Sequence, residues 1–284
     1  MKLRVATCQV LPEPDVDAAP LAVALAAAGF DAALVAWDDP AADWDAAIPT
    51  ILRSTWNYPL ALDRFLAWVD RAAAAAPLLN PPAVVRANVH KRYLLELAAR
   101  GVPTVPTTLV ERGETCELPR ERLVIKPEVG AASLDAQVFA PGDPAAAAHL
   151  AALTARGAAL VQPYLASIEA YGERSLVMID GELSHAIRKT PRFSGEDERV
   201  TGPFAIADDE RTVALAALAP YGDLLYGRVD VARDAAGQPL VMELELVEPS
   251  LFFDWCPGSA ERYARALLRR LTGTRSAPGR APSA

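Results

Sequence analysis

Two segments near the C-terminus alternate charged with apolar side chains, and this alternation constrains the fold more than any other feature of the chain. The first reads Tyr-Gly-Arg228-Val-Asp230-Val, and the second reads Val-Met-Glu243-Leu-Glu245-Leu. Because successive side chains of a strand point to opposite faces, Arg228 and Asp230 share one face of the first segment. Glu243 and Glu245 share one face of the second in the same way. A Gly-Gln-Pro turn between the segments predicts that they form a β-hairpin.

The two faces of this hairpin differ in character. One is apolar and is expected to pack on a core: Val229, Val231, Met242, Leu244 and Leu246. The charged face has two interpretations, a surface exposed to water or a site where the three carboxylates converge on a hard divalent cation. Like charges that face each other across a sheet cost up to about 1 kcal/mol, which a bound cation would remove. Since Mg²⁺ takes oxygen ligands and bridges them to substrate phosphates, the second interpretation predicts a Mg–nucleotide site. Arg228 would then hold a transferring phosphoryl group.

The first eighty residues alternate short apolar runs with helical ones. Strands are expected at 3–9, 32–37 and 48–53, and helices at 20–29 and 60–76. Strands and helices that alternate with connections too long for hairpins indicate a small parallel α/β domain. No G-x-G-x-x-G follows the first strand, so a dinucleotide site is not expected there.

The run Asn80-Pro-Pro punctuates the chain after this domain. A helix is expected next, with Asn88 as its cap, Lys91 in its first turn and Gly101 at its end. The rest of the chain is β-rich. We therefore expect an α/β chain in four parts: an N-terminal domain over 1–82, β-rich subdomains over 83–163 and 164–272, and a disordered tail over 273–284.

Two hairpins are predicted in the β-rich part. Asp180-Gly-Glu is a tight-turn signal between strands expected at 174–179 and 183–189. The charged hairpin described above is expected to run over 224–232 and 240–246.

The composition limits the partners of the chain. Its 28 Lys and Arg stand against 36 Asp and Glu, for a formal net charge of −8, which argues against a nucleic-acid or anionic-membrane partner. The three cysteines are widely spaced and suit a reducing compartment. The N-terminus has too little apolar content for a signal peptide, so a cytoplasmic protein is expected. The sequence leaves open whether the chain forms a homodimer.

The positions of two lysines favour a role in a binding site. Lys126 ends the apolar run Leu-Val-Ile-Lys-Pro, and a lysine at the end of such a strand points into the mouth of a sheet. Lys91 begins the helix that follows the first domain. Each also has a plainer interpretation as a solvated residue, and both interpretations stay open on the residues alone.

In this order along the chain, the elements resemble the ATP-grasp superfamily over residues 5–271. Lys91, its helix and the following Val-Pro-Thr-Val-Pro-Thr look like the family's first phosphate lysine and entry strand. Lys126 looks like the second lysine, followed by a small-residue phosphate loop over 130–135. Gln162-Pro-Tyr-Leu resembles the adenine hinge, and Gly-Glu173-Arg resembles an element of glutathione synthetases. The resemblance implies an ATP-grasp fold, in which an N-terminal α/β domain precedes two β-rich subdomains that sandwich ATP.

The resemblance also implies a set of site residues. Those implied to bind the nucleotide are Lys91, Lys126, Ser133, Gln162, Tyr164, Leu165 and Glu173. The implied Mg²⁺ ligands are Asp230, Glu243 and Glu245. The residues implied to act in catalysis are Arg228, Arg188 and Lys126, with Arg188 on the acyl phosphate or the acceptor. The chain departs from the family in two respects: the third metal position usually holds Asn, and the phosphate loop here has only one glycine.

Substrate contacts are expected from three segments, and their residues are Ser54, Trp56, Tyr58, Lys189, Glu248 and Ser250. The aromatic residues have an alternative role in packing. The charged stretch 192–202 is interpreted as a lid over the reacting atoms or as a plain surface loop. His185 is expected to be structural.

The implied activity is that of an ATP- and Mg²⁺-dependent ligase, which activates a small carboxylate as an acyl phosphate. Arg-Ser54-Thr-Trp-Asn-Tyr and Glu245-Leu-Val-Glu-Pro-Ser together look closest to the D-cycloserine-forming cyclo-ligases of antibiotic biosynthesis. Such an enzyme would close a ring within a D-serine derivative. Three alternatives remain: an intermolecular ligase of amino acids or dipeptides, a ligase that modifies a protein, and a non-catalytic nucleotide-binding protein.

Overall fold

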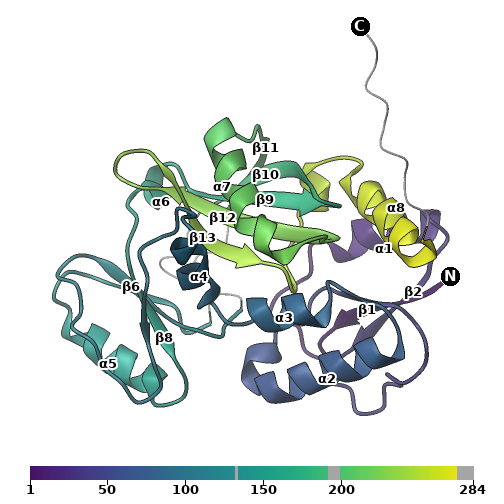
Figure 1. The fold of residues 1–284 in the computed structure, drawn as a ribbon, viewed down its shortest axis with the longest axis horizontal. Coiled ribbons are helices and arrows are strands. Elements are labelled where there is room, and N and C mark those ends of the chain that lie inside the picture. Colours follow the sequence, from purple (N-terminus) through teal and green to yellow (C-terminus); the bar gives the residue numbers. More distant parts are fainter. Residues whose placement is uncertain (132–133, 191–198, 274–284) are drawn as a thin grey trace, which may run out of the picture.

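The computed structural model describes residues 1–131, 134–190 and 199–273 of the 284-residue chain. Within these residues the strands form three sheets, one parallel and two antiparallel, with helices packed against each (Figure 1). This arrangement confirms the expected α/β class. In the same residues, no helix has both the length and the apolar character that a membrane crossing would require.

The N-terminal sheet is parallel, with the order β2-β1-β3-β4. Its strands are β1 (Lys2–Thr7), β2 (Asp31–Ala36), β3 (Thr50–Leu52) and β4 (Leu78–Leu79). The helices between them are α1 (Ala18–Ala27) and α2 (Leu62–Ala75), the second preceded by a 3-10 turn, η1 (Tyr58–Ala61). The strands and helices expected from the sequence are confirmed, with bounds that differ by one or two residues. Three aromatic rings pack together in this domain. The rings of Trp37 and Phe65 meet edge to face, and the ring of Trp68 is tilted against both.

Two short helices, α3 (Pro82–Asn88) and α4 (Tyr93–Ala99), connect this domain to the second sheet. The second sheet has the order β5-β8-β6-β7 and is covered by one helix. Its members are β5 (Thr108–Val110), β6 (Leu123–Pro127), β7 (Gln137–Phe139), β8 (Ala159–Pro163) and the covering helix α5 (Pro144–Thr154). Leu123 and Ile125 of β6 face Leu150 and Leu153 of that helix, which closes a small core of its own.

The third sheet has the order β11-β10-β9-β12-β13 and is antiparallel throughout. Its strands are β9 (Glu173–Ile179), β10 (Glu182–Thr190), β11 (Arg199–Phe204), β12 (Tyr226–Arg233) and β13 (Pro239–Glu245). The accompanying helices are α6 (Ser167–Ala170), α7 (Asp208–Leu218), η2 (Ala219–Tyr221), η3 (Phe253–Trp255) and α8 (Ser259–Thr272). Both predicted hairpins are confirmed. Asp180 and Gly181 form the tight turn with φ of 55° and 79°, in the left-handed region that such a turn requires.

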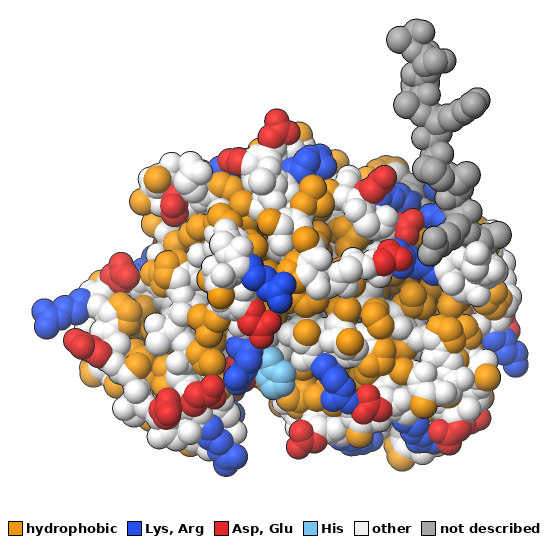
Figure 2. All heavy atoms as spheres, viewed as in Figure 1, with side chains coloured by type: hydrophobic (Ala, Val, Ile, Leu, Met, Phe, Trp, Pro, Cys, Tyr) orange, Lys and Arg blue, Asp and Glu red, His pale blue; other side chains and the backbone are white. Residues whose placement is uncertain are grey.

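Tertiary packing joins the first and third sheets. Leu21 and Leu25 of α1 lie in one apolar cluster with Tyr263 and Leu267 of α8, and the two helices run side by side (Figure 1). On the face shown in Figure 2, acidic and basic side chains are interspersed, and the surface is hollowed between the lobe that holds β6 and β8 and the rest of the molecule.

Three expectations about single residues are wrong. Asn88 does not cap the helix that follows, because it is the last residue of α3, and α4 begins only at Tyr93. Lys91 consequently lies in the connection between the two helices and not in a first turn. Met242 leaves the apolar face of the charged hairpin, because the register shifts between Asp230, which pairs with Glu243, and Val231, which pairs with Val241. This bulge turns the Met242 side chain toward the cavity described below.

Candidate active site

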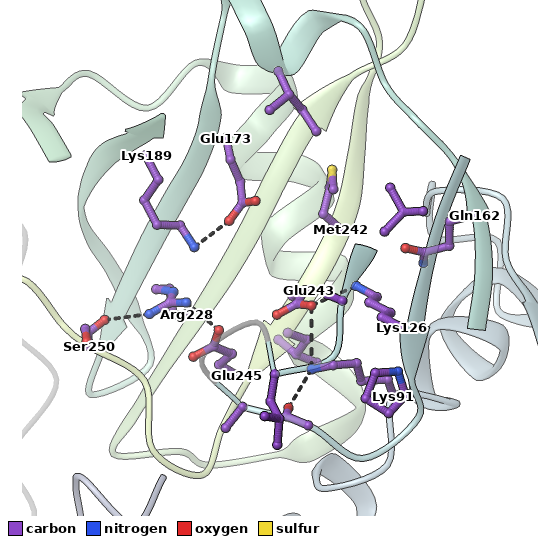
Figure 3. A pocket seen from close by; sticks show the side chains of 18 of the residues that line it. Lys91, Lys126, Gln162, Glu173, Lys189, Arg228, Met242, Glu243, Glu245 and Ser250 are labelled. Carbon is purple, nitrogen blue, oxygen red and sulfur yellow. Dashed lines mark hydrogen bonds and ion pairs between the residues drawn. The ribbon is translucent and has the colours of Figure 1, made fainter. Parts of the chain in front are cut away.

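A cavity of about 320 Å³ lies between the second and third sheets. Four strands place side chains into it: Lys126 comes from β6, Gln162 from β8, Arg228 from β12 and Glu243 from β13 (Figure 3). Each of these residues was a candidate from the sequence. The cavity therefore brings together residues that are far apart in the sequence, such as Lys126 and Glu243, which are separated by 117 positions.

Two carboxylates of the charged hairpin, those of Glu243 and Glu245, line this cavity, and the buried carboxylate of Asp230 lies beside them. Pairing across the hairpin sets Arg228 opposite Glu245 and Asp230 opposite Glu243. One carboxylate oxygen from each of Asp230, Glu243 and Glu245 lies within 4.8 Å of the others. Asp230 is fully buried, so the charged face is not a water-exposed surface. Three convergent oxygen donors fit a hard divalent cation such as Mg²⁺.

Arg228 neutralises part of this carboxylate cluster. Its Nε and Nη2 donate to the two oxygens of Asp230 at 2.9 Å each, and Nη2 also contacts Glu245. Its Nη1 donates to the carbonyl oxygen of Ser250 at 3.1 Å. Burial alone would raise the pKa of Asp230, but the charges of Arg228 and Lys189 outweigh it and hold that pKa well below its usual range. The Glu245 carboxyl has a raised pKa, first because of burial.

Lys91 and Lys126 meet on a single carboxylate. The Nζ of Lys126 donates to Glu243 Oε1 at 2.7 Å, and the Nζ of Lys91 lies 3.5 Å from the same oxygen (Figure 3). Lys91 also donates to the carbonyl oxygen of Gly130 at 3.0 Å. Burial opposes ionisation of Glu243, but the two lysines outweigh it and lower the pKa of that carboxyl. Both lysines are largely buried, with side chains 15% and 9% exposed, so neither is a solvated surface residue.

Glu128 holds the connection that carries Lys91, a role that the sequence did not indicate. Its carboxylate lies 3.4 Å from His90 Nδ1 and also contacts Arg92 Nε. Its carbonyl oxygen accepts from the Lys91 amide at 2.9 Å. Burial raises the pKa of Glu128, but hydrogen bonds from His90 and Arg92 outweigh this and lower it to about 2. Because Glu128 follows Lys126 by two residues, it ties the two lysine-bearing segments together.

The residues of the predicted adenine hinge also line the cavity: Gln162, Tyr164 and Leu165. Gln162 Nε2 donates to Thr107 Oγ1 at 2.9 Å, which fixes its amide. The guanidinium of Arg122 stacks over the ring of Tyr164, 3.8 Å from the centroid. The predicted phosphate-loop residue Ser133 lies outside the described residues, as do 192–198 of the predicted lid and the predicted tail from residue 274 onward.

Neighbouring residues of β10 face opposite sides of the sheet. Lys189 points into the cavity, where its Nζ lies 2.5 Å from Glu173 Oε1 and 2.8 Å from Asp230 Oδ2. Burial, together with the charge of Asp230, outweighs Lys189 and raises the pKa of Glu173 to about 7. Arg188 points the other way: its Nε donates to Thr201 Oγ1 at 3.3 Å, and its guanidinium lies over the ring of Phe204. This structure therefore brings Lys189 to the cavity and leaves Arg188 outside it.

Most of the predicted substrate residues lie at the cavity, but one does not. Trp56, Tyr58, Glu248 and Ser250 line the cavity, and Trp56 Nε1 donates to the carbonyl oxygen of Glu248 at 2.9 Å. Burial first, and then the charge of Glu245, raises the pKa of Glu248 to about 8. Ser54 does not reach the cavity, since it is buried and its Oγ pairs with Thr7 Oγ1 at 2.9 Å.

A buried ion pair holds the loop that carries Glu248 and Ser250. Asp17 Oδ2 accepts from Arg53 Nη2 at 2.9 Å, and the Asp17 carboxylate also accepts from the Leu251 and Phe253 amides at 2.5 and 3.0 Å. Sequence reasoning missed Asp17, because an aspartate before a helix is typical of a cap. The structural expectation for His185 agrees with its buried contact to the Leu251 carbonyl at 2.9 Å.

The chain matches one protein family over its N-terminal part. Residues 3–80 fit the family described as D-cycloserine synthetase DcsG, N-terminal domain. The chain is 36% identical to the cycloserine biosynthesis protein DcsG of Streptomyces lavendulae over 283 aligned residues. The alignment covers 90% of this chain and 94% of that protein.

Solved structures share the fold. The crystal structure of D-cycloserine synthetase DcsG superposes with a TM-score of 0.86 at 34% identity, over 95% of this chain and 100% of that one. The ATP-grasp ligase PsnB, solved with its minimal precursor, Mg and ADP, has a TM-score of 0.61 at 15% identity, over 95% of this chain and 98% of that one. The ATP-grasp fold expected from the sequence is thereby confirmed.

Proposed function

The chain belongs to the family of the cycloserine biosynthesis protein DcsG, and on that premise we propose that it is an ATP- and Mg²⁺-dependent cyclo-ligase. It would activate the carboxylate of one small amino-acid-like substrate and close a ring of the D-cycloserine type within it. That the protein is cytoplasmic and that it forms a homodimer are still predictions from the sequence alone.

One observation carries this proposal. Lys91, Lys126 and Arg228 converge with the three carboxylates on one cavity, whose substrate end is lined by Trp56 and Glu248. Phosphoryl transfer needs positioning and charge neutralisation more than a covalent nucleophile, and this set supplies both. The chemistry of the side chains thus suits ATP at the lysines and an activated carboxylate near the arginine.

Each group has a role in this proposal. Asp230, Glu243 and Glu245 would hold Mg²⁺, which when bound neutralises charge on the phosphates of ATP. Lys91 and Lys126 would leave Glu243 and bind phosphate oxygens. In the first step a carboxylate oxygen of the substrate bonds to the γ-phosphorus, ADP leaves, and an acyl phosphate results.

In the second step a nitrogen of the same substrate attacks the carbonyl carbon of the acyl phosphate. The carbon–nitrogen bond closes the ring, inorganic phosphate leaves, and the nitrogen gives up a proton. Where the nitrogen carries a carbamoyl group, as in O-ureido-D-serine, water must also remove that group as carbon dioxide and ammonia to leave a ring of the D-cycloserine type. Arg228 stabilises the charge on the phosphoryl group in both steps. Because the nitrogen and the carbonyl are already tethered, ring closure gains effective molarity and requires no second amino acid.

A reaction with a single substrate tests the proposal. Enzyme, Mg-ATP and a linear D-serine derivative such as O-ureido-D-serine are incubated, and mass spectrometry is expected to find a cyclic product together with ADP. The Glu243→Gln variant serves as the matched control and is expected to form neither. Formation of ADP and a dipeptide only after a second amino acid is added would establish the intermolecular ligase instead.

A further inference from the structure

The strand that carries Glu243 and Glu245 is an edge strand, yet its outer edge is not open. β13 ends the third sheet: one edge pairs with β12, and the outer edge makes one parallel backbone bridge, at Val241 with Thr104, before it reaches Leu244. Glu243 and Glu245 take part in the pairing with β12, so the backbone groups of Leu244 and Leu246 point outward. An unpaired edge is free to shift or to pair with other chains. Here the helices α3 and α4 lie alongside it (Figure 1).

Two side chains complete this edge as a neighbouring strand would. Asn88 Nδ2 donates to the Leu244 carbonyl oxygen at 2.8 Å, and Asn88 Oδ1 accepts from the Leu246 amide at 2.7 Å. The Leu244 amide donates to Tyr93 Oη at 3.0 Å. One primary amide thus binds a carbonyl and the amide two residues later, which is the pattern that the N–H and C=O of a single residue in a parallel neighbouring strand offer.

These contacts bracket one carboxylate. Glu245 lies between Leu244 and Leu246, and its side chain leaves the backbone on the cavity side. When the backbone is held on both flanks of a residue, the direction of its Cα–Cβ bond is held as well. The Asn88 side chain is itself buried, so few alternative positions are open to it.

The same two residues also dock the segment that carries Lys91. α3 ends at Asn88 and α4 begins at Tyr93, so both ends of the connection 89–92 are bound to β13. From this position the Nζ of Lys91 lies 3.5 Å from Glu243 Oε1. The spacing between the first lysine and the carboxylates is therefore set by hydrogen bonds of side chains to the strand, and not by a continuous sheet.

We propose that Asn88 is a positioning residue that orients the Glu245 carboxylate for the divalent cation by completing the edge of β13. The inference rests on the proposed metal site. It assigns Asn88 no contact with substrate. Side chains that orient metal ligands without touching the metal commonly change metal affinity when they are replaced.

Binding of Mn²⁺ in place of Mg²⁺ tests this inference without turnover. Free Mn²⁺ is measured by electron paramagnetic resonance in the presence of ADP and the full-length protein. Asn88→Leu keeps the volume of the side chain but loses both hydrogen bonds, and is expected to weaken Mn²⁺ binding roughly 10-fold. Tyr93→Phe removes only the acceptor for the Leu244 amide and is expected to give a smaller loss in the same direction.

Asn80→Ala provides the matched structural control. The Asn80 amide also binds backbone groups of this hairpin, the carbonyl oxygens of Tyr226 and Leu246 and the Leu225 amide, but it does not bracket Glu245. Its loss is expected to lower the melting temperature at least as much as Asn88→Leu while leaving Mn²⁺ affinity at the wild-type value. Equal losses of affinity in both variants would make Asn88 merely structural and overturn the inference.

A double variant separates this inference from the metal site itself. If Asn88 acts through Glu245, Asn88→Leu is expected to have no further effect on Mn²⁺ affinity in a Glu245→Gln background. Additive losses would contradict the inference. Wild-type Mn²⁺ binding by Glu243→Gln would instead contradict the metal site, whatever the Asn88 variants show.

Discussion

The two ends of the cavity hold their charges differently. At the lysine end, defined by Lys91, Lys126 and Glu243, two cations share one carboxylate oxygen. At the arginine end, Arg228 and Lys189 face three carboxylates, those of Asp230, Glu245 and Glu173. Counting formal charges, the first end has two cations against one anion, and the second has two cations against three anions.

This difference shows how one cavity can receive two kinds of ligand. The lysine end has an excess of positive charge and suits a polyphosphate. The arginine end has an excess of negative charge, which favours a divalent cation or the ammonium group of an amino acid. Both ends are largely dry, so each charge is screened less than it would be at the surface.

Glu243 is the carboxylate on which the contrast depends, because it contacts both lysines and lies beside Asp230. Glu243→Gln is expected to lower kcat by more than roughly 100-fold, since a metal ligand and its charge are lost together. The fold is expected to stay intact, and ATP binding is expected to be weaker but detectable by calorimetry. Glu114→Gln, on an exposed loop, is the matched control. Near-normal turnover at saturating Mg²⁺ would remove the metal assignment.

The protonation of Glu248 makes the stability of the folded protein depend on pH. Its pKa of about 8 in the folded chain lies above the usual value for glutamate, so the folded chain keeps a proton that the unfolded chain releases. The stability from that proton is complete below the usual pKa and is lost as pH rises through the folded pKa. Glu248→Gln is therefore expected to stabilise the nucleotide-free protein at pH 8.5 by on the order of 3 kcal/mol, with little change at pH 4.5.

Urea unfolding at the two pH values measures this effect. Glu243→Gln is the counterpart with opposite sign, because the folded-state pKa of Glu243 is lowered and its contribution to stability is present at high pH. That variant is expected to be less stable than the wild type at pH 8.5. If Glu248→Gln has the same effect at both pH values, folding does not raise the pKa of Glu248, the carboxyl is ionised at neutral pH, and the arginine end carries one more negative charge than stated.

The lysines provide the smallest of the three effects. Lys126→Ala is expected to raise the ATP dissociation constant about 10-fold, as for the loss of one charge-assisted hydrogen bond. Lys91→Ala is expected to act in the same direction but less strongly, since Lys91 lies farther from Glu243 and is more exposed. Calorimetry measures both constants, with the exposed Lys2→Ala as the control. Unchanged affinity in both variants would place ATP elsewhere.

The sequence by itself predicted the parallel N-terminal domain, the two hairpins and most of the charged side chains of the cavity. Alternation with period two is a local property, so the common face of Asp230, Glu243 and Glu245 follows from the pattern without knowledge of any partner. The order of Lys91, Lys126 and the hinge along the chain likewise determined which fold to expect. The first inference needed only the geometry of a strand, and the second rests on the resemblance of these motifs to ATP-grasp proteins.

Tertiary structure decided what local patterns cannot contain. Asn88 has the residue type of a helix cap, but the edge of a strand 156 residues away takes its amide. One extra residue in the register of β13 turned the Met242 side chain to the other face of the hairpin. Of two neighbouring residues on β10, Lys189 points into the cavity and Arg188 points away from it. The raised pKa of Glu248 comes from burial and from a neighbouring charge. Each outcome depends on which distant groups share a low-dielectric space, and only the packed chain specifies that.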